Sequence, residues 1–223
     1  MNTYKGLLFD LDGVIVDTAK YHYLAWKELA KELEIPFTEK DNERLKGVSR
    51  MASFEIILEI GGRSMSQTEK EACCAKKNEI YVEYIKKLKD DEILPGVKNF
   101  LTDARAKGYR TALGSASKNS PMILERLGIA KLFDAVIDGT KTSKAKPDPE
   151  VFLKGAQALG LGNEECIVFE DAAAGILAAH NGGMTAVGIG DPAVLSEADL
   201  VMDGFDGITV DGVIDKLRLQ SIR

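Results

Sequence analysis

Short apolar runs alternate with helical stretches along most of this chain, and this alternation limits the folds that it can adopt. Apolar runs that suit buried strands lie at Lys5–Asp10, Tyr109–Gly114, Ala135–Asp138, Cys166–Glu170, Thr185–Ile189 and Leu200–Met202. From Leu94 onward, stretches of about ten residues with helical periodicity separate these runs. Such alternation predicts strand–helix units around a parallel sheet. We therefore expect an α/β fold, with a Rossmann-like parallel sheet core and helices on both faces.

One segment interrupts the alternation before Leu94. It contains three helical patterns and no convincing strand, at Thr18–Glu34, Arg50–Ile60 and Ser66–Leu88. A helical block after the first strand predicts an inserted α-helical cap domain over residues 17–88, so that residues 1–16 and 89–223 form an α/β catalytic core. Within that core, Ser120 followed by Pro121 is typical of an N-cap and a first helical residue.

Charge and cysteine content exclude several classes of protein. The chain has 223 residues, 29 basic and 35 acidic, with a formal net charge of −6. This balance argues against a nucleic-acid partner, and no apolar run approaches the roughly 18 residues of a membrane span. The three cysteines predict neither a disulfide framework nor a zinc site, since two are adjacent and one is remote: Cys73, Cys74 and Cys166. The apolar N-terminal stretch does not resemble a signal peptide, because Asp10 and Asp12 interrupt it. We expect a cytoplasmic monomer that binds neither nucleic acid nor membranes.

Polar and charged side chains follow several of the predicted strands. In chain order they are Asp10, Asp12, Ser115–Asn119, Lys146, Glu170 and Asp171. In an open parallel sheet, ligands bind beyond the carboxyl ends of the strands, so we expect these side chains to converge. Several carboxylates with a lysine suit a divalent metal together with a phosphate.

The acidic residues predict the chemistry. Asp10 and Asp12 lie two residues apart, and Gly13 permits a turn that directs both into one cavity. A carboxylate can attack phosphorus and form an aspartyl phosphate, while Glu170 and Asp171 would supply the oxygen ligands that Mg²⁺ prefers. A single aspartate after a strand is usually a turn former, but acidic pairs after two different strands favour a site.

The other candidates are weaker. Ser115–Asn119 precede a helix and offer hydrogen-bond donors to a phosphate, although alone they fit an ordinary polar turn equally well. Lys146 could balance the aspartates, but most lysines are simply solvated. In the insert, Ser49 and Arg50 begin a helix and could hold an anion, which spacing alone supports only weakly.

Two further residues of the insert stand out by helical geometry. Lys77 lies near the centre of a predicted apolar stripe made by Cys73, Ile80, Tyr84 and Leu88. A lysine there is costly unless it faces a cleft or a counterion. His22 shares an apolar helix face with Trp26, where a lone histidine is more often a packed core residue than a functional one.

The first motif, L-F-D-L-D-G-V-I-V-D-T, resembles that of the haloacid dehalogenase-like superfamily of phosphotransferases. The Ser115 region, Lys146–Pro147 and Glu170–Asp171 resemble its second, third and fourth motifs, and the helical insert resembles the cap of its phosphatase and mutase branch. A narrower resemblance, to phosphosugar mutases of that branch, rests on Thr18, His22, Trp26, Lys46-Gly47-Val48-Ser49-Arg50, Ser53, Lys77–Asn78, Ser115–Asn119 and Glu170–Asp171.

The resemblance implies a role for each of these residues. Asp10 would be the phosphorylated nucleophile and Asp12 the general acid and base. Mg²⁺ would be held by Asp10, the backbone carbonyl of Asp12, Glu170 and Asp171. Ser115 and Lys146 would bind the transferring phosphoryl group, Arg50 with Ser117 and Asn119 the distal phosphate, and His22 and Lys77 would position Asp12 and the sugar. The remaining expected substrate contacts are Thr18, Trp26, Gly47, Val48, Ser49, Ser53, Ala116 and Lys118.

The implied activity is the interconversion of β-D-glucose 1-phosphate and glucose 6-phosphate. β-Glucose 1,6-bisphosphate would serve as primer and intermediate, and sugar phosphates would be the small-molecule partners. Two alternatives stay open. A sugar-phosphate phosphatase of the same superfamily needs the same core motifs, and a ligand-binding protein that has lost catalysis could keep the fold.

Overall fold

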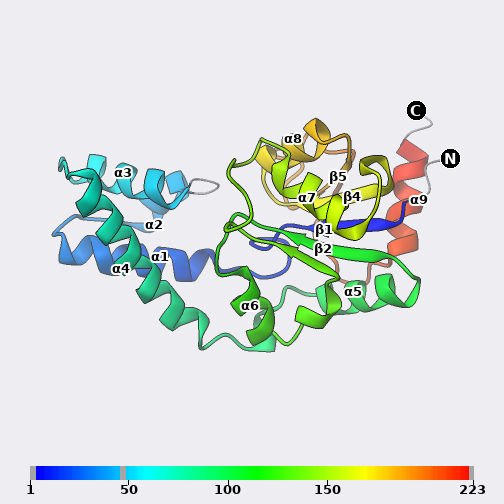
Figure 1. The fold of residues 1–223 in the computed structure, drawn as a ribbon, viewed down its shortest axis with the longest axis horizontal. Coiled ribbons are helices and arrows are strands. Elements are labelled where there is room, and N and C mark those ends of the chain that lie inside the picture. The colour runs from blue at the N-terminus through cyan, green and yellow to red at the C-terminus, as the bar shows by residue number, and fades with distance from the viewer. Residues whose placement is uncertain (1–3, 46–48, 221–223) are drawn as a thin grey trace. The chain divides into compact units, whose positions relative to one another are not determined.

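A computed structural model of the protein describes residues 4–45 and 49–220. The chain divides into two compact units, one formed by the residues up to Asp17 together with those from Lys89 onward, and one formed by residues 18–88. Each unit has its own apolar core. Figure 1 shows the strands gathered in the first unit, while the second is entirely helical.

The first unit is built on a parallel sheet. Within the described residues its strands are β1 (Gly6–Phe9), β2 (Arg110–Gly114), β3 (Ala135–Ile137), β4 (Cys166–Glu170), β5 (Thr185–Ile189) and β6 (Leu200–Met202). Their order is β3-β2-β1-β4-β5-β6, and every pairing is parallel. The chain first adds strands on one side of β1 and then on the other. The order therefore reverses between β1 and β4, the place where open α/β sheets bind ligands.

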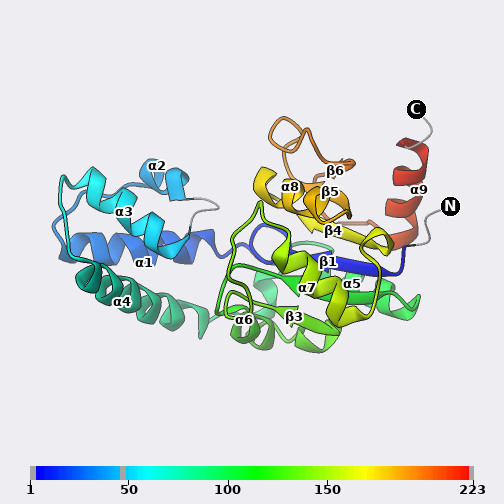
Figure 2. The same ribbon diagram turned by 45° about the horizontal axis from the view of Figure 1, so that its top comes forward.

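Helices cover both faces of this sheet, which confirms the predicted α/β fold. They are α5 (Val97–Ala106), α6 (Ser120–Arg126), α7 (Glu150–Leu159), α8 (Ala173–Asn181) and α9 (Val210–Gln220), with short 3₁₀ turns at Asp90–Glu92, Ala130–Leu132 and Asn163–Glu165. Leu8 of β1 packs in the core formed with residues of α7 and α8, two helices whose places beside the sheet can be followed in Figure 2. The next residue, Phe9, joins an aromatic cluster on the opposite face with Phe100 of α5, Phe169 and Phe205. Adjacent side chains of a strand thus anchor opposite layers.

The second unit contains α1 (Ala19–Glu32), α2 (Glu39–Asn42), α3 (Arg50–Ile60) and α4 (Gln67–Ile85), with a 3₁₀ turn at Glu43–Leu45. α2 was not among the three helices predicted. It has four residues, none of them buried, so no apolar periodicity could reveal it. A capping box between Thr38 and Asp41 holds it.

Two sequence predictions about helices were wrong by one position. The buried face of α4 carries Cys74, Lys77, Tyr81 and Ile85, whereas Cys73, Ile80 and Tyr84 are only half-buried. Tyr81 is preferred inside because its hydroxyl finds a buried acceptor, Thr18 Oγ1, at 3.0 Å. The N-cap of α6 is Asn119, so Ser120 is already the first helical residue, and its hydroxyl donates to the carbonyl of Ser117 at 2.7 Å.

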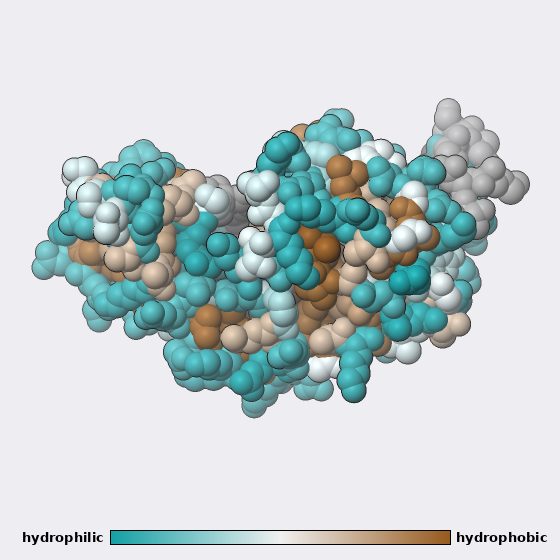
Figure 3. Space-filling model, in the orientation of Figure 1, coloured by the Kyte–Doolittle hydropathy of each residue, from teal (hydrophilic) through white to brown (hydrophobic). Residues whose placement is uncertain are grey.

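None of the helices in the described ranges combines the length and the apolar character needed to cross a bilayer. The face drawn in Figure 3 is hydrophilic over most of its area, with apolar side chains showing in separate patches.

Candidate active site

Strand register brings three of the predicted site residues to one edge of the sheet. Phe9 of β1 lies opposite Leu113 of β2 and opposite Phe169 of β4. The residues that follow, Asp10, Gly114 and Glu170, therefore stand at one level, with Ser115 one position further on. The backbone N–H of Asp10 donates to the carbonyl of Phe169 at 3.0 Å, which fixes Asp10 beside β4.

Lys146 connects the acids of β1 and β4. Its Nζ lies 2.5 Å from Asp10 Oδ1 and 2.5 Å from Glu170 Oε1. All three side chains are largely buried, Glu170 being only 1% exposed. Lys146 comes from the loop between β3 and α7, a third chain segment. Lys146 is 136 residues from Asp10 and 24 residues from Glu170 along the chain, so the fold brings together charges that are distant in sequence.

This cluster carries surplus negative charge. Burial and the nearby Glu170 and Asp12 carboxylates raise the pKa of Asp10 to about 7, although Lys146 acts in the opposite direction. Desolvation and the carboxylates of Glu170 and Asp10 raise the pKa of Asp171 to about 8. Burial alone would lower the pKa of Lys146. The carboxylates of Asp10 and Glu170 outweigh the effect of burial and raise this pKa, so the ammonium group stays charged.

The same acids fit a divalent metal. Carboxylate oxygens of Asp10, Glu170 and Asp171 all lie within 4.8 Å of one another. Mg²⁺ prefers such oxygen ligands, and a cation there would offset carboxylates that Lys146 balances only in part. The donor set and its unbalanced charge therefore suit Mg²⁺.

The turn after β1 places Asp12. Asp12 forms an isolated bridge with Val16, and the N–H of Gly13 donates to the Val16 carbonyl at 2.9 Å. Gly13 has a φ of 75°, a left-handed conformation that favours glycine. Asp12 is half-buried, and it interacts with the cluster by raising the pKa of Asp10.

The loop after β2 is shaped by its own hydroxyl groups. Ser115 Oγ accepts from the N–H of Ser117 at 3.1 Å, and Ser117 Oγ accepts from the N–H of Asn119 at 3.3 Å. Ser115 is buried, whereas Ala116 and Lys118 are exposed. The loop thus keeps Ser115 buried at the sheet edge and leaves Ala116 and Lys118 exposed.

In the helical unit, Lys77 is buried against aromatic rings. Its Nζ lies 4.8 Å from the centre of the Trp26 ring and 4.7 Å from that of Tyr81, and 2.7 Å from His22 Nδ1. Cation–π contacts and a nitrogen acceptor stabilise a lysine that is only 2% exposed. The sequence indicated that a buried Lys77 needs a cleft or a counterion. The structure provides two aromatic rings and the His22 nitrogen instead, all within the helical unit.

His22 is held neutral in a defined tautomer. Burial, then the positive charges of Lys77 and Arg50, lower the pKa of His22 well below its usual value. Lysine nitrogen is a donor, so Nδ1 accepts and the imidazole proton lies on Nε2. The ring also stacks on Tyr81 at 4.0 Å. His22 therefore presents an N–H donor at Nε2.

The other predicted site residues that the structure describes in this unit lie on α1 and α3 or at the N-caps of these helices. Arg50 NH2 donates to Asn78 Oδ1 at 2.8 Å, and Ser49 Oγ caps α3 by accepting from the N–H of Ala52. Thr18, Trp26 and Ser53 are buried. Gly47 and Val48 lie outside the described residues.

Sequence reasoning missed Tyr81 and Glu150. Tyr81 supplies both a ring for Lys77 and a hydroxyl for Thr18, but it lies outside the apolar stripe that the sequence predicted for this helix. Glu150 begins α7 and accepts from the backbone N–H groups of Ser143 and Lys144, both at 2.8 Å. It thereby holds the loop that carries Lys146. An acid directly after Pro149 was the available signal.

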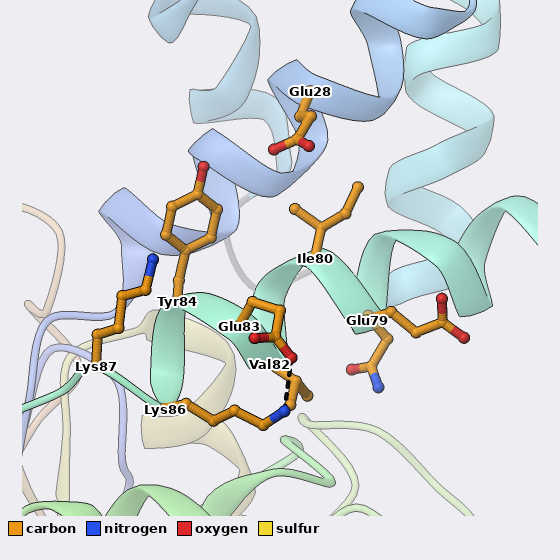
Figure 4. Close-up of a pocket in the computed structure, with 9 residues that line it drawn as sticks. Glu28, Glu79, Ile80, Val82, Glu83, Tyr84, Lys86 and Lys87 are labelled. Atoms are coloured by element: carbon orange, nitrogen blue, oxygen red, sulfur yellow. Dashed lines mark hydrogen bonds and ion pairs between the residues drawn. The ribbon is translucent and has the colours of Figure 1, made fainter.

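An open depression of about 570 Å³ lies elsewhere on the helical unit, between α1 and α4. Figure 4 shows Ile80 and Tyr84 of α4 pointing toward the helix that carries Glu28, whereas Glu83 points away from Glu28 and pairs with Lys86. Of the residues that carry the resemblance to phosphosugar mutases, Asn78 lines it, and none of the residues predicted to contact the substrate does.

Comparison with known proteins establishes the class. The family model described as haloacid dehalogenase-like hydrolase matches residues 4–183. The chain belongs to this family, which confirms the resemblance inferred from its first motif. It is 43% identical over 209 residues, 93% of this chain and 92% of the relative, to a protein named beta-phosphoglucomutase from Bacillus subtilis (strain 168).

Two further relatives are informative. A crystal structure of beta-phosphoglucomutase from Clostridium difficile superposes with a TM-score of 0.92 at 40% identity, covering 99% of this chain and 100% of that one. The fructose-1-phosphate phosphatase YqaB of Escherichia coli (strain K12) is 31% identical over 186 residues, 83% of this chain and 96% of the relative. Relatives of this fold thus include both named mutases and named phosphatases.

Proposed function

We propose that this protein is a Mg²⁺-dependent phosphosugar mutase that interconverts β-D-glucose 1-phosphate and glucose 6-phosphate. The observation that carries the proposal is the buried Asp10 carboxylate, held by Lys146 beside Glu170 at the switch point of the sheet. The 43% identity to a named beta-phosphoglucomutase over 93% of the chain supports the choice of substrate.

Asp10 would act as the nucleophile and Asp12 as the proton carrier. With Asp10 phosphorylated, the 6-hydroxyl oxygen of β-glucose 1-phosphate attacks phosphorus, the bond from phosphorus to the Asp10 oxygen breaks, and Asp12 takes the hydroxyl proton. This yields β-glucose 1,6-bisphosphate. After the bisphosphate reorients, an Asp10 oxygen attacks the phosphorus at position 1, and Asp12 returns the proton to the departing sugar oxygen.

Asp10, Glu170 and Asp171, with the backbone carbonyl of Asp12, would hold Mg²⁺. When bound, this ion would offset negative charge on the phosphoryl oxygens and on the nucleophile. Lys146 and Ser115 would bind the transferring phosphoryl group. The position of Lys146 Nζ, 2.5 Å from Asp10 Oδ1, supports this role because the new bond to phosphorus forms at that carboxylate.

We further propose that residues 18–88 act as a cap whose positive charge recognises a phosphate-bearing ligand. Arg50, with Ser117 and Asn119, would bind the distal phosphate, while His22 and Lys77 would position the sugar and Asp12. The buried Lys77 ammonium group and the half-buried Arg50 guanidinium support the proposal, since both are cationic and lie beside a neutral His22. Closure of such a cap would exclude water, which otherwise hydrolyses the aspartyl phosphate.

A sugar-phosphate phosphatase is the second candidate. It would use the same Asp10 chemistry, with water replacing the sugar hydroxyl as the attacking group. The 31% identity to a named fructose-1-phosphate phosphatase favours it to some extent, although the identity to the named mutase is greater over a larger share of the chain.

Phosphorus NMR distinguishes the two candidates. The protein is incubated with Mg²⁺, β-D-glucose 1-phosphate and a trace of β-glucose 1,6-bisphosphate, with the α anomer in parallel. A mutase converts the β anomer to glucose 6-phosphate with little free phosphate. Phosphate released in excess of glucose 6-phosphate would identify a phosphatase, and no Mg²⁺-dependent turnover would leave a non-catalytic binding protein.

A further inference from the structure

Gly175 occupies an unexpected place in α8. Three alanines precede it, Ala172, Ala173 and Ala174, and alanine is the better helix former. No turn or left-handed backbone explains a glycine here, because residue 175 lies within the helix and outside the set of positive-φ glycines. Its lack of a side chain therefore has a packing cause.

The space beside Gly175 is filled by the Glu170 carboxylate. A Cβ built on Gly175 would fall 1.8 Å from Glu170 Oε1, 2.0 Å from Cδ and 2.4 Å from Cγ. These distances are far below van der Waals contact, so any side chain at position 175 would displace the whole carboxyl group.

The Glu170 side chain has no easy alternative position. Its Oε1 accepts from Lys146 Nζ at 2.5 Å, and its Oε2 accepts from the N–H of Ala172 at 2.9 Å. The residue is 1% exposed. Moving the carboxylate would break both hydrogen bonds inside the protein, where water could not replace them.

We propose that Gly175 is a positioning residue for the metal site: its missing side chain leaves the notch in which the Glu170 carboxylate is held. The neighbouring acid is packed in the same way, because a Cβ on Gly13 would fall 2.1 Å from Asp171 Oδ2. Gly13 also has a positive φ, which adds backbone strain to any substitution. Gly175 therefore offers the cleaner test. The inference rests on the proposed Mg²⁺ site but not on the identity of the sugar phosphate.

A thermodynamic cycle on metal-free protein tests the steric part. The melting temperature is measured for the wild type, Gly175→Ala, Glu170→Ala and the double variant. Gly175→Ala should lower the melting temperature when Glu170 is present, and leave it unchanged or raise it when Glu170 is alanine, since the notch is then empty. If Gly175→Ala folds only when Glu170 is also replaced by alanine, this result would support the proposal as well. Equal losses in both backgrounds would overturn it.

Calorimetric titration with MgCl₂ tests the functional part. We expect Gly175→Ala to weaken Mg²⁺ binding by about tenfold or more, the usual effect of disturbing the support of a metal ligand. Gly212→Ala in α9 is the matched control, because its Cβ would meet only Thr209 Oγ1, at 3.3 Å, and it should bind as the wild type does. Wild-type affinity in Gly175→Ala would contradict the proposal. If the protein shows no mutase activity, the melting and Mg²⁺-binding measurements still test the role of Gly175, because neither uses a sugar phosphate.

Discussion

The two units hold their reactive side chains in opposite electrostatic surroundings. At the sheet edge, Asp10 and Asp171 have raised pKa values because they are desolvated and crowded by carboxylates. In the helical unit, His22 has a lowered pKa because it is buried beside Lys77 and Arg50. One unit carries an excess of negative charge around a single lysine, and the other an excess of cationic groups around a neutral histidine.

The two units also reach these arrangements by different structural means. The acids are fixed by the register of parallel strands, which leaves little freedom at Asp10 and Glu170. The cationic groups are held by side-chain contacts, among them the rings of Trp26 and Tyr81 and the amide of Asn78. An acidic site suits a metal ion and a cationic one suits a phosphate. The contrast predicts that substitutions in the two units have different kinetic consequences.

The largest effect is expected in the acidic cluster. Asp10→Asn keeps the shape of the side chain but removes the nucleophile, so the rate of sugar-phosphate interconversion should fall by about 10⁴-fold or more. The rate is followed by a coupled assay for glucose 6-phosphate. Asp215→Asn, exposed on α9, is the control and should retain full activity. A normal rate in Asp10→Asn would refute the assignment of the nucleophile.

A smaller effect is expected in the helical unit. Arg50→Ala removes a guanidinium proposed to bind the distal phosphate, and kcat/KM for β-D-glucose 1-phosphate should fall by about 10²-fold. Slow hydrolysis of the phosphorylated protein, measured by phosphate release, should change little because water carries no distal phosphate. Arg44→Ala, an exposed arginine paired with Glu59, serves as the control. Equal losses in both reactions would contradict this role for Arg50.

The acidic cluster should also couple metal binding to pH. The pKa values of Asp10 and Asp171 are raised to about 7 and about 8, so Mg²⁺ must displace protons in order to bind. Below these values the Mg²⁺ affinity should fall by about tenfold per pH unit for each proton displaced. The same raised pKa values make the metal-free protein less stable as the pH rises from the ordinary aspartate pKa of 3.8 toward about 8. Titration calorimetry in buffers of different ionisation enthalpy measures the released protons. An affinity independent of pH between about 6 and 8 would show that these carboxyls are already ionised.

The smallest effect concerns Glu150, which holds the loop of Lys146. Its hydrogen bonds from Lys154 and from the backbone of Lys144 and Ser143 lower its pKa from 4.5 to about 2. The ionised group therefore stabilises the fold above its ordinary pKa, and this contribution is lost as the pH falls toward 2. Glu150→Gln should lower the melting temperature at neutral pH by a few degrees and lose this deficit in acid. Exposed Glu125→Gln should show no such pattern, and an unchanged pH profile in Glu150→Gln would remove the anchoring role.

The sequence predicted the fold well because the strands are short, apolar and regularly separated. Each predicted strand run contains the observed strand, and Arg50–Ile60 matches α3. The sheet rule that ligands bind beyond strand ends then predicted which acids would approach one another. Short elements such as α2 escaped because a four-residue helix without buried residues has no periodicity.

Side-chain packing was harder to predict than topology. Two neighbouring stripes of α4 both carry apolar side chains, and the contacts of Tyr81 with His22 and Thr18 favour burial of the stripe that contains Tyr81. Gly175 was overlooked because a glycine among alanines carries no pattern, and its cause is a carboxylate five residues earlier. Such requirements depend on atoms that meet only in three dimensions.

The central claim is that Asp10 carries the phosphoryl group during turnover. Protein mixed with Mg²⁺ and β-glucose 1,6-bisphosphate is quenched within the reaction time and digested, and the peptide containing Asp10 is analysed by mass spectrometry. The account predicts one added phosphoryl group on Asp10 itself, absent when β-glucose 1,6-bisphosphate is omitted. An unmodified Asp10 peptide during measurable turnover, or a phosphoryl group on another residue, would contradict it.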